Sequence, residues 1–135
     1  MREILFRAKR LDSDEWVEGD LSYLVHNKEK MYVFPTDGLD SADRYEVDPE
    51  TLCQYTGKSD ENGKKIFEGD IVGFIDLYST ESGYSESSCL GEVVWSEEEC
   101  CFHVTNRLSA ESWEVLDECK VVGNVFDDKE LLEEF

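Results

Sequence analysis

The sequence predicts a mainly β fold, on three observations. Short runs of branched and aromatic residues recur along the chain. Turn-forming Gly, Asn, Asp and Ser residues separate these runs. Only the C-terminal residues have the apolar spacing of a regular α-helix. The length of 135 residues suits one domain, which we expect to consist of N-terminal hairpins at 1–47, a β core at 48–126 and a C-terminal helix at 127–135.

Three segments are expected to build the N-terminal hairpins. Ile4, Phe6 and Ala8 alternate with the side chains between them, which predicts a half-buried first strand. The following elements are a second strand, a hairpin loop, a third strand and a loop, expected at 16–25, 27–30, 31–34 and 35–45.

The β core is expected to begin with a helical turn at Asp48 and Pro49. Asp48 can accept hydrogen bonds from backbone N–H groups, and proline suits the first helical position. A short strand at 53–55 and a tight turn at 60–63 follow. The Asn-Gly pair in that turn supplies the positive φ angles of a primed turn, but its polar flanks do not predict a regular hairpin.

The second half of the chain contains the most apolar strand. Residues 71–75 are apolar on both faces, which predicts a central strand. Five serines, a threonine and a glycine make 77–88 the expected mobile loop. The remaining strands are expected as a hairpin around the acidic turn 96–99 and one or two strands after it, at 91–95, 101–105, 115–116 and 121–125.

The C-terminal helix has a recognisable start and an apolar face. Asp127 is the expected N-cap, and Glu130 three residues on completes a box-like pattern. Leu131, Leu132 and Phe135 share one face. A helix this short must dock on the body of the protein to be stable.

The central residues resemble a known family. They read Gln54-Tyr55-Thr56-Gly57, Asp60, Asn62-Gly63-Lys64 and Ile66-Phe67-Glu68-Gly69-Asp70-Ile71-Val72. This string is similar to the signature of the YopX family of phage and prophage proteins. Weaker similarity at 2–8, 91–95, 122–127 and 130–132 extends the resemblance over nearly the whole chain, apart from 35–46 and 77–88. The resemblance implies a small, mostly β protein encoded on mobile bacterial genomes, and it carries over no catalytic residue or cofactor.

A Glu-Gly-Asp string between apolar residues occurs twice, within 17–24 and within 67–74. Glycine can adopt turn angles and aspartate can bond nearby amides, so we predict the same turn chemistry at the start of a strand in both copies. The second copy is also similar to the turn that leads into a strand of small SH3-like barrels. By this analogy the β core is expected to be a small SH3-like barrel or a strongly bent antiparallel sheet.

The strongly negative net charge of the chain makes some classes of binding partner unfavourable. The 13 basic and 33 acidic side chains give a net charge of −20. Nucleic-acid backbones and anionic lipids both attract clustered Lys and Arg, so this charge counts against direct binding to nucleic acid or membrane. The charge also makes copies repel one another, so a homo-oligomer would have to bury apolar area or use the basic N-terminal strand, which carries a net +3 over residues 1–10.

The sequence contains neither a signal-peptide core nor an apolar run long enough to span a membrane. We therefore expect a protein of the bacterial host cytoplasm. The odd number of cysteines fits a reducing compartment in which they remain thiols.

The residues with metal-binding or nucleophilic chemistry do not form a recognisable motif. No Cys-x-x-Cys pair of the kind common in zinc sites occurs. On a strand Cys101 and His103 would share a face while Cys100 points away, and nothing in the sequence orients a Cys101–His103 catalytic pair. The spacings of an EF-hand calcium loop, a P-loop and a Gly-x-Ser-x-Gly elbow are also absent from the sequence.

We therefore expect a phage or prophage accessory protein that binds a host or phage protein, without enzymatic activity, cofactor or metal. The candidate interaction surface consists of Tyr55, Asp60, Asn62, Glu68, Asp70 and Trp95. Two alternatives stay open. One is an acidic mimic of DNA that inhibits a host DNA-binding protein, and the other is an enzyme with an unrecognised site around Cys101 and His103.

Overall fold

The structure is a computed structural model that describes residues 3–23, 30–35, 44–105, 112–115 and 118–133. These residues form strands in two antiparallel sheets, a 3₁₀ turn and a short α-helix, which confirms the mainly β class. The chain divides into two compact units, residues 1–57 and 58–135, and the boundary lies inside strand β5 (Cys53–Ser59). No helix within the described ranges is long and apolar enough to cross a membrane.

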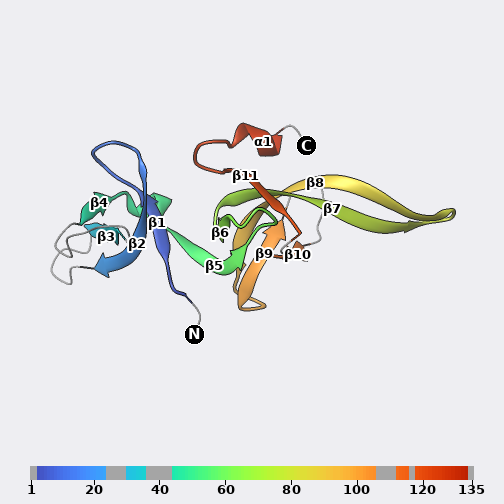
Figure 1. The fold of residues 1–135 in the computed structure, drawn as a ribbon, viewed down its shortest axis with the longest axis horizontal. Helices are drawn as coiled ribbons and strands as arrows, with labels where there is room; N and C mark the ends of the chain where they lie inside the picture. The colour runs from blue at the N-terminus through green and yellow to red at the C-terminus, as the bar shows by residue number, and fades with distance from the viewer. Residues whose placement is uncertain (1–2, 24–29, 36–43, 106–111, 116–117, 134–135) are drawn as a thin grey trace. The chain divides into compact units, whose positions relative to one another are not determined.

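Unit 1 is an antiparallel sheet in the order β4-β3-β2-β1-β5, drawn from blue to green in Figure 1. Before β5 it contains β1 (Phe6–Lys9), β2 (Trp16–Tyr23), β3 (Met31–Pro35), β4 (Tyr45–Val47) and the 3₁₀ turn η1 (Pro49–Thr51). Its core consists of Ala8, Val17, Met31, Val33 and Val47. The predicted pairing of the second and third strands is confirmed, with Leu21 opposite Val33.

Two sequence predictions in unit 1 concern loops. The residues predicted to link the second and third strands fall largely outside the described residues, which resume at Lys30. The predicted loop at 35–45 ends where β4 begins, a strand that the sequence did not predict, and residues 36–43 lie outside the described ranges.

The predicted alternation of β1 is confirmed only in part, because residues on both faces of the strand are buried. Leu5 and Ala8 are buried, whereas Ile4 is 57% exposed. Arg7 is also buried, and its guanidinium carbon lies 4.8 Å from the centre of the Trp16 ring. An arginine can bury its apolar stem while its cationic head contacts an aromatic face. Arg7 is therefore buried although the predicted alternation places it on the face opposite Phe6 and Ala8.

The predicted helical turn after Asp48 is confirmed as η1. The Asp48 carboxylate accepts a hydrogen bond from the Glu50 backbone N–H at 3.0 Å, and Pro49 occupies the first turn. Thr51 then links this turn to β1, because its hydroxyl oxygen accepts a hydrogen bond from the Lys9 backbone N–H at 2.8 Å.

Unit 2 is built on a five-stranded antiparallel sheet in the order β10-β9-β8-β7-β11. Its elements are β6 (Lys65–Phe67), β7 (Asp70–Thr80), β8 (Gly83–Ser96), β9 (Cys101–Thr105), β10 (Ser112–Glu114), β11 (Lys120–Asn124) and α1 (Glu130–Glu133). Its core consists of Ile66, Val72, Val93, Val104, Val115 and Cys119. β7 is an interior strand between β8 and β11 at residues 70–73, which confirms the predicted central strand for the first part of 71–75. The edge strands β10 and β11 do not pair with each other in the described part of the chain, so the sheet is open and an SH3-like barrel is not confirmed.

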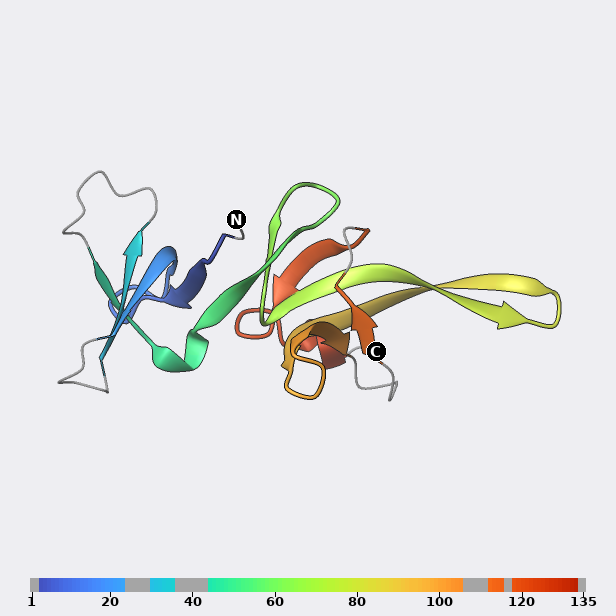
Figure 2. The same ribbon diagram turned by 90° about the horizontal axis from the view of Figure 1, so that it is seen from below.

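The segment at 77–88, predicted as a mobile loop, is instead the end of a long β-hairpin, so that prediction was wrong. β7 and β8 pair continuously from Ile71 opposite Glu92 to Thr80 opposite Gly83. Figures 1 and 2 show the two strands leaving the sheet as a twisted ribbon. Serine-rich composition predicts a loop, but the ladder is made by backbone groups that every residue here possesses. We call residues 74–91 the β7–β8 ribbon.

A second hairpin forms where the polar flanks did not predict one. β5 and β6 are neighbours in the sheet order, and the turn between them is closed by the Asp60 backbone N–H, which donates to the Lys64 carbonyl at 2.8 Å. The turn forms where it was predicted, and Gly63 has a φ of +82°, but Asn62 does not have a positive φ, so the predicted primed geometry was wrong.

The two Glu-Gly-Asp strings do not form the same structure. Gly69 turns the chain between β6 and β7 with a φ of +85°. Gly19 instead lies inside β2, opposite Pro35 of β3. The prediction of a shared turn was therefore wrong for the first copy.

The C-terminal helix begins later than predicted. α1 covers Glu130–Glu133, and Phe135 of its predicted apolar face lies outside the described residues. Lys129 directly precedes α1, so Asp127 is not at the predicted N-cap position and lies in a preceding turn organised by Asn124. The Asn124 side-chain oxygen accepts hydrogen bonds from the backbone N–H groups of Phe126 and Asp127, both at 3.0 Å. This turn delays the start of the helix.

Candidate functional site

Three of the six residues predicted as an interaction surface are buried. Tyr55, Asp60 and Asp70 expose 8%, 6% and 1% of their surface. Tyr55 belongs to unit 1, where its backbone N–H donates to the Leu5 carbonyl at 2.8 Å. These side chains offer little area to a partner.

The Asp60 carboxylate organises the β5–β6 turn. One oxygen accepts hydrogen bonds from the backbone N–H groups of Asn62 and Lys64, and the other from that of Val121, all at 2.9 Å. The Val121 N–H and then the other two donors hold the pKa of Asp60 below its usual value, although burial opposes them. Asp60 therefore ties the turn to β11 and has a structural role.

Asp70 has a comparable role at the start of β7. Its carboxylate accepts a hydrogen bond from the Phe67 backbone N–H at 2.8 Å across the turn at Gly69. The turn also joins two other segments, since the Gly69 N–H donates to the Val93 carbonyl and the Gly69 carbonyl accepts from the Val125 N–H. The turn at Glu68-Gly69-Asp70 therefore connects the start of β7 to two other segments of unit 2.

The other three predicted residues, Asn62, Glu68 and Trp95, reach the surface to different degrees. Asn62 is exposed on the β5–β6 turn, and Glu68 is partly exposed. Trp95 is 46% exposed and packs edge-on against Phe102, with ring centres 5.1 Å apart. Trp95 is the one large apolar side chain of the predicted six that is open to a partner.

An apolar groove lies at the base of the β7–β8 ribbon in unit 2. Its volume is about 390 Å³. Phe74, Ile75, Leu90 and Val122 supply most of its apolar lining. Three charged residues, Glu61, Glu118 and Lys120, line it as well, and the Lys120 ammonium lies 3.3 Å from the Glu61 carboxylate. The sequence did not predict this groove.

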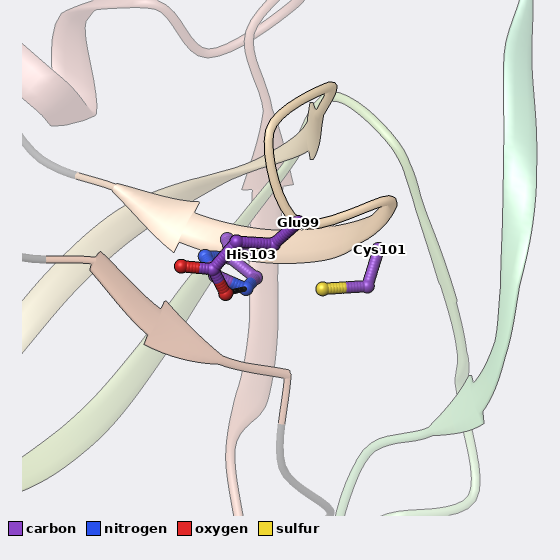
Figure 3. A group of neighbouring side chains, drawn as sticks. All are labelled: Glu99, Cys101 and His103. Atoms are coloured by element: carbon purple, nitrogen blue, oxygen red, sulfur yellow. Dashed lines mark ion pairs between the residues drawn. The ribbon is translucent and has the colours of Figure 1, made fainter.

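A cluster of three possible ligands lies at the turn between β8 and β9 (Figure 3). The donor atoms of Glu99, Cys101 and His103 all lie within 4.8 Å of one another. A carboxylate oxygen of Glu99 is 3.1 Å from His103 Nε2. His103 is 7% exposed, whereas Glu99 lies at the surface. The three side chains offer oxygen, sulfur and nitrogen, which is a donor set for a metal ion.

The same cluster bears on the enzyme alternative. The contact between Glu99 and His103 Nε2 can orient the imidazole, and the sequence did not predict it. The groove at the base of the ribbon, however, is lined by none of these three residues.

The family assignment follows from the whole chain. The family model described as YopX protein matches residues 5–133. The chain belongs to the YopX family. This confirms the resemblance read from the central residues of this YopX protein. No protein with a curated description matches the chain significantly.

Among solved structures, this YopX chain is similar to protein EF1440 from Enterococcus faecalis. The similarity covers 98% of this chain and 99% of that one, with a TM-score of 0.54 and 21% sequence identity. At this identity the similarity concerns the fold alone.

Proposed function

We propose that this YopX protein is a phage or prophage accessory protein that acts by binding another protein in the cytoplasm of the bacterial host, without catalysis. The observation that carries this proposal is the exposed β7–β8 ribbon together with the apolar groove at its base. The proposed occupant is an extended segment of the partner protein, with an apolar residue next to Lys or Arg.

The ribbon has open edges along most of its length. β11 pairs with β7 only as far as Gly73, and β9 pairs with β8 only from Glu92 onward. Between these limits the described strands supply no third neighbour. Exposed edges of this kind are templates for another strand, and a two-stranded ribbon is marginally stable by itself. A partner strand would stabilise it.

An added strand would continue the line of β11 along β7. Backbone groups of β7 from Ile75 to Thr80 would hydrogen-bond to it, which is the mode of recognition called β-augmentation. The groove lies where β11 stops, so one apolar side chain of the added strand would enter between Phe74, Ile75 and Val122. Apolar burial would supply affinity at that point.

The negative charge of unit 2 favours a basic residue next to the apolar residue of the partner segment. Residues 58–135 contain 20 acidic and 6 basic side chains, a net charge of −14. Glu118 lies at the groove itself. A basic residue beside the apolar one would therefore be attracted, and long-range attraction would speed association.

The test is a quantitative capture experiment with the full chain immobilised and host lysate as the source of partners. Ile75→Glu places a charge in the groove at a residue that is 60% exposed, so folding is expected to be retained. Ile4→Glu is the matched control, because Ile4 is 57% exposed and belongs to unit 1. We expect one or more proteins to bind wild type and Ile4→Glu, and to lose at least about 10-fold in retention on Ile75→Glu.

A second arm identifies the occupant. A synthetic peptide containing the apolar–basic segment of the captured protein should displace it. Equal retention on Ile75→Glu and wild type would contradict the proposal, and so would measurable turnover of a captured substrate.

The distribution of exposed acidic residues does not favour the alternative that the protein is an acidic mimic of DNA. Such a mimic needs carboxylates in two rows at phosphate-like spacing. Exposed acids among the described residues are scattered instead, at the turns 12–15, 97–99 and 127–130 and on strands at Glu18, Asp20 and Glu86. Raising the salt concentration in the same capture experiment tests this, because groove binding should weaken modestly whereas binding through many charges falls steeply.

A further inference from the structure

We propose that Glu99, Cys101 and His103 form a binding site for one divalent transition-metal ion, with zinc as the best-suited metal. The site lies at the turn between β8 and β9, and it is independent of the groove and of the proposed protein partner. It would hold the metal through one carboxylate oxygen, one thiolate sulfur and one imidazole nitrogen.

The backbone brings the three donors to one side of the hairpin. Cys101 and His103 are two residues apart on β9, so their side chains share a face. This face is opposite to that of Val104, which packs in the core of unit 2. Cys100 has a φ of +55° at the end of the turn, and the chain reverses there so that Glu99 reaches the same side. Figure 3 shows the Cys101 sulfur pointing toward Glu99 and His103.

The distances are close to those of a metal site. Zinc bonds of about 2.0 Å to nitrogen and oxygen and about 2.3 Å to sulfur place tetrahedral ligand atoms roughly 3.3–3.6 Å apart. The Glu99 oxygen and His103 Nε2 are 3.1 Å apart, and no pair of donor atoms exceeds 4.8 Å. Movement of about 1 Å by the exposed Glu99 or the partly exposed Cys101 closes the difference.

The donor types and their charges favour zinc. Mixed nitrogen, sulfur and oxygen ligands suit this borderline-soft ion, whereas calcium and magnesium prefer oxygen alone. A thiolate and a carboxylate together neutralise the two positive charges of the ion, and His103 binds as a neutral imidazole. Glu97 and Glu98 in the same turn are exposed and raise the local concentration of cations.

Three protein ligands leave one tetrahedral position for water. This is the coordination of open zinc sites, whereas closed structural sites use four protein ligands. The β8–β9 hairpin is already closed by backbone pairing from Glu92 opposite Thr105 to Ser96 opposite Cys101. The metal would therefore add to the stability of a hairpin that forms without it.

The test uses the full chain, stripped of metal with a chelator and titrated with Zn²⁺ and then with Co²⁺. We expect one zinc per chain for wild type. Cys101→Ser and Glu99→Gln should each weaken binding by at least about 10-fold, the loss that even outer-shell changes cause. Cys100→Ser is the matched control, because this neighbouring exposed thiol is not part of the cluster, and it should bind zinc as wild type does.

Cobalt gives a second readout that does not depend on stability. Co²⁺ bound to a thiolate has a sulfur-to-metal charge-transfer band in the near ultraviolet. The band should appear in wild type and Cys100→Ser and be absent from Cys101→Ser, with circular dichroism confirming that all three are folded. A band that persists in Cys101→Ser, or zinc affinity that is the same in wild type and Cys101→Ser, would overturn the proposal.

Discussion

The strings Glu18-Gly19-Asp20 and Glu68-Gly69-Asp70 are identical in sequence but form different structures, a strand and a turn. In unit 1 the string runs straight through β2, and its aspartate is exposed. In unit 2 the string turns the chain between β6 and β7, and its aspartate is 1% exposed. Both copies need their glycine, but for different reasons.

Close approach of a neighbouring strand requires the first glycine, and backbone conformation requires the second. A Cβ atom at Gly19 would lie 1.7 Å from the Phe34 carbonyl oxygen of β3. Gly69 has a φ of +85°, a conformation that L side chains rarely adopt. The short string therefore indicates that glycine is needed at its centre but not for which reason. The neighbouring strand determines the reason at Gly19, and the backbone conformation determines it at Gly69.

The largest expected effect is that of Gly19→Ala. The methyl group would meet the backbone of β3 and separate β2 from β3, so we expect unit 1 to lose about 3 kcal/mol of stability. Gly73→Ala is the control, because a Cβ there meets its nearest atom, Leu90 Cδ2, at an ordinary 3.4 Å. Urea unfolding gives the magnitude, and hydrogen exchange should place the loss in β2 and β3. Equal stability of the two variants would refute the close-approach explanation.

The next largest difference in stability is expected between alanine substitutions of the two aspartates, Asp70 and Asp20. Asp70→Ala leaves the buried Phe67 N–H without its 2.8 Å acceptor, so we expect a loss of about 2 kcal/mol. Asp20→Ala removes an exposed side chain from β2 and should change stability by less than about 0.5 kcal/mol. Urea midpoints of the two variants measure the difference. Similar losses at both positions would mean that the strings are structurally equivalent.

Gly69→Ala should cost about 1–2 kcal/mol, because alanine at a positive φ is strained. Gly69→Asn is the informative companion, since asparagine tolerates the left-handed region better and should recover part of the loss. If alanine and asparagine were equally destabilising, the positive φ would not be the reason for glycine at this position. Thermal unfolding of both variants against wild type measures the effect.

Acid should reveal a smaller contribution from Asp60. Its pKa is lowered in the folded protein, chiefly by the Val121 N–H, so the charged form stabilises unit 2. This stability is fully present above the unfolded pKa of about 3.9 and is lost as the pH falls through the lowered folded value. The stability difference between wild type and Asp60→Asn should therefore narrow as the pH falls below about 5. A difference independent of pH in urea unfolding would contradict this role.

The candidate sites could be predicted only in part. Strand periodicity correctly placed Cys101 and His103 on one face, because side-chain direction alternates along any strand. Glu99 could not be assigned, since its position depends on the left-handed residue Cys100 in the turn. The groove was not predictable either, because it forms only where β11 lies beside the β7–β8 hairpin, and β9 and β10 separate β11 from that hairpin in the sequence.

The sequence by itself determined the strand-rich class, the Asp48–Pro49 turn, the Asn-Gly turn and the family, because each depends on local propensity or on a contiguous string. Only the tertiary structure decided that the serine-rich segment is a paired ribbon, that Asp60 and Asp70 are buried acceptors, and that one Glu-Gly-Asp copy is a strand. The physical reason is the same in each case. Pairing, burial and close approach depend on which distant backbone lies opposite a residue, and a residue's neighbours in sequence do not contain that information.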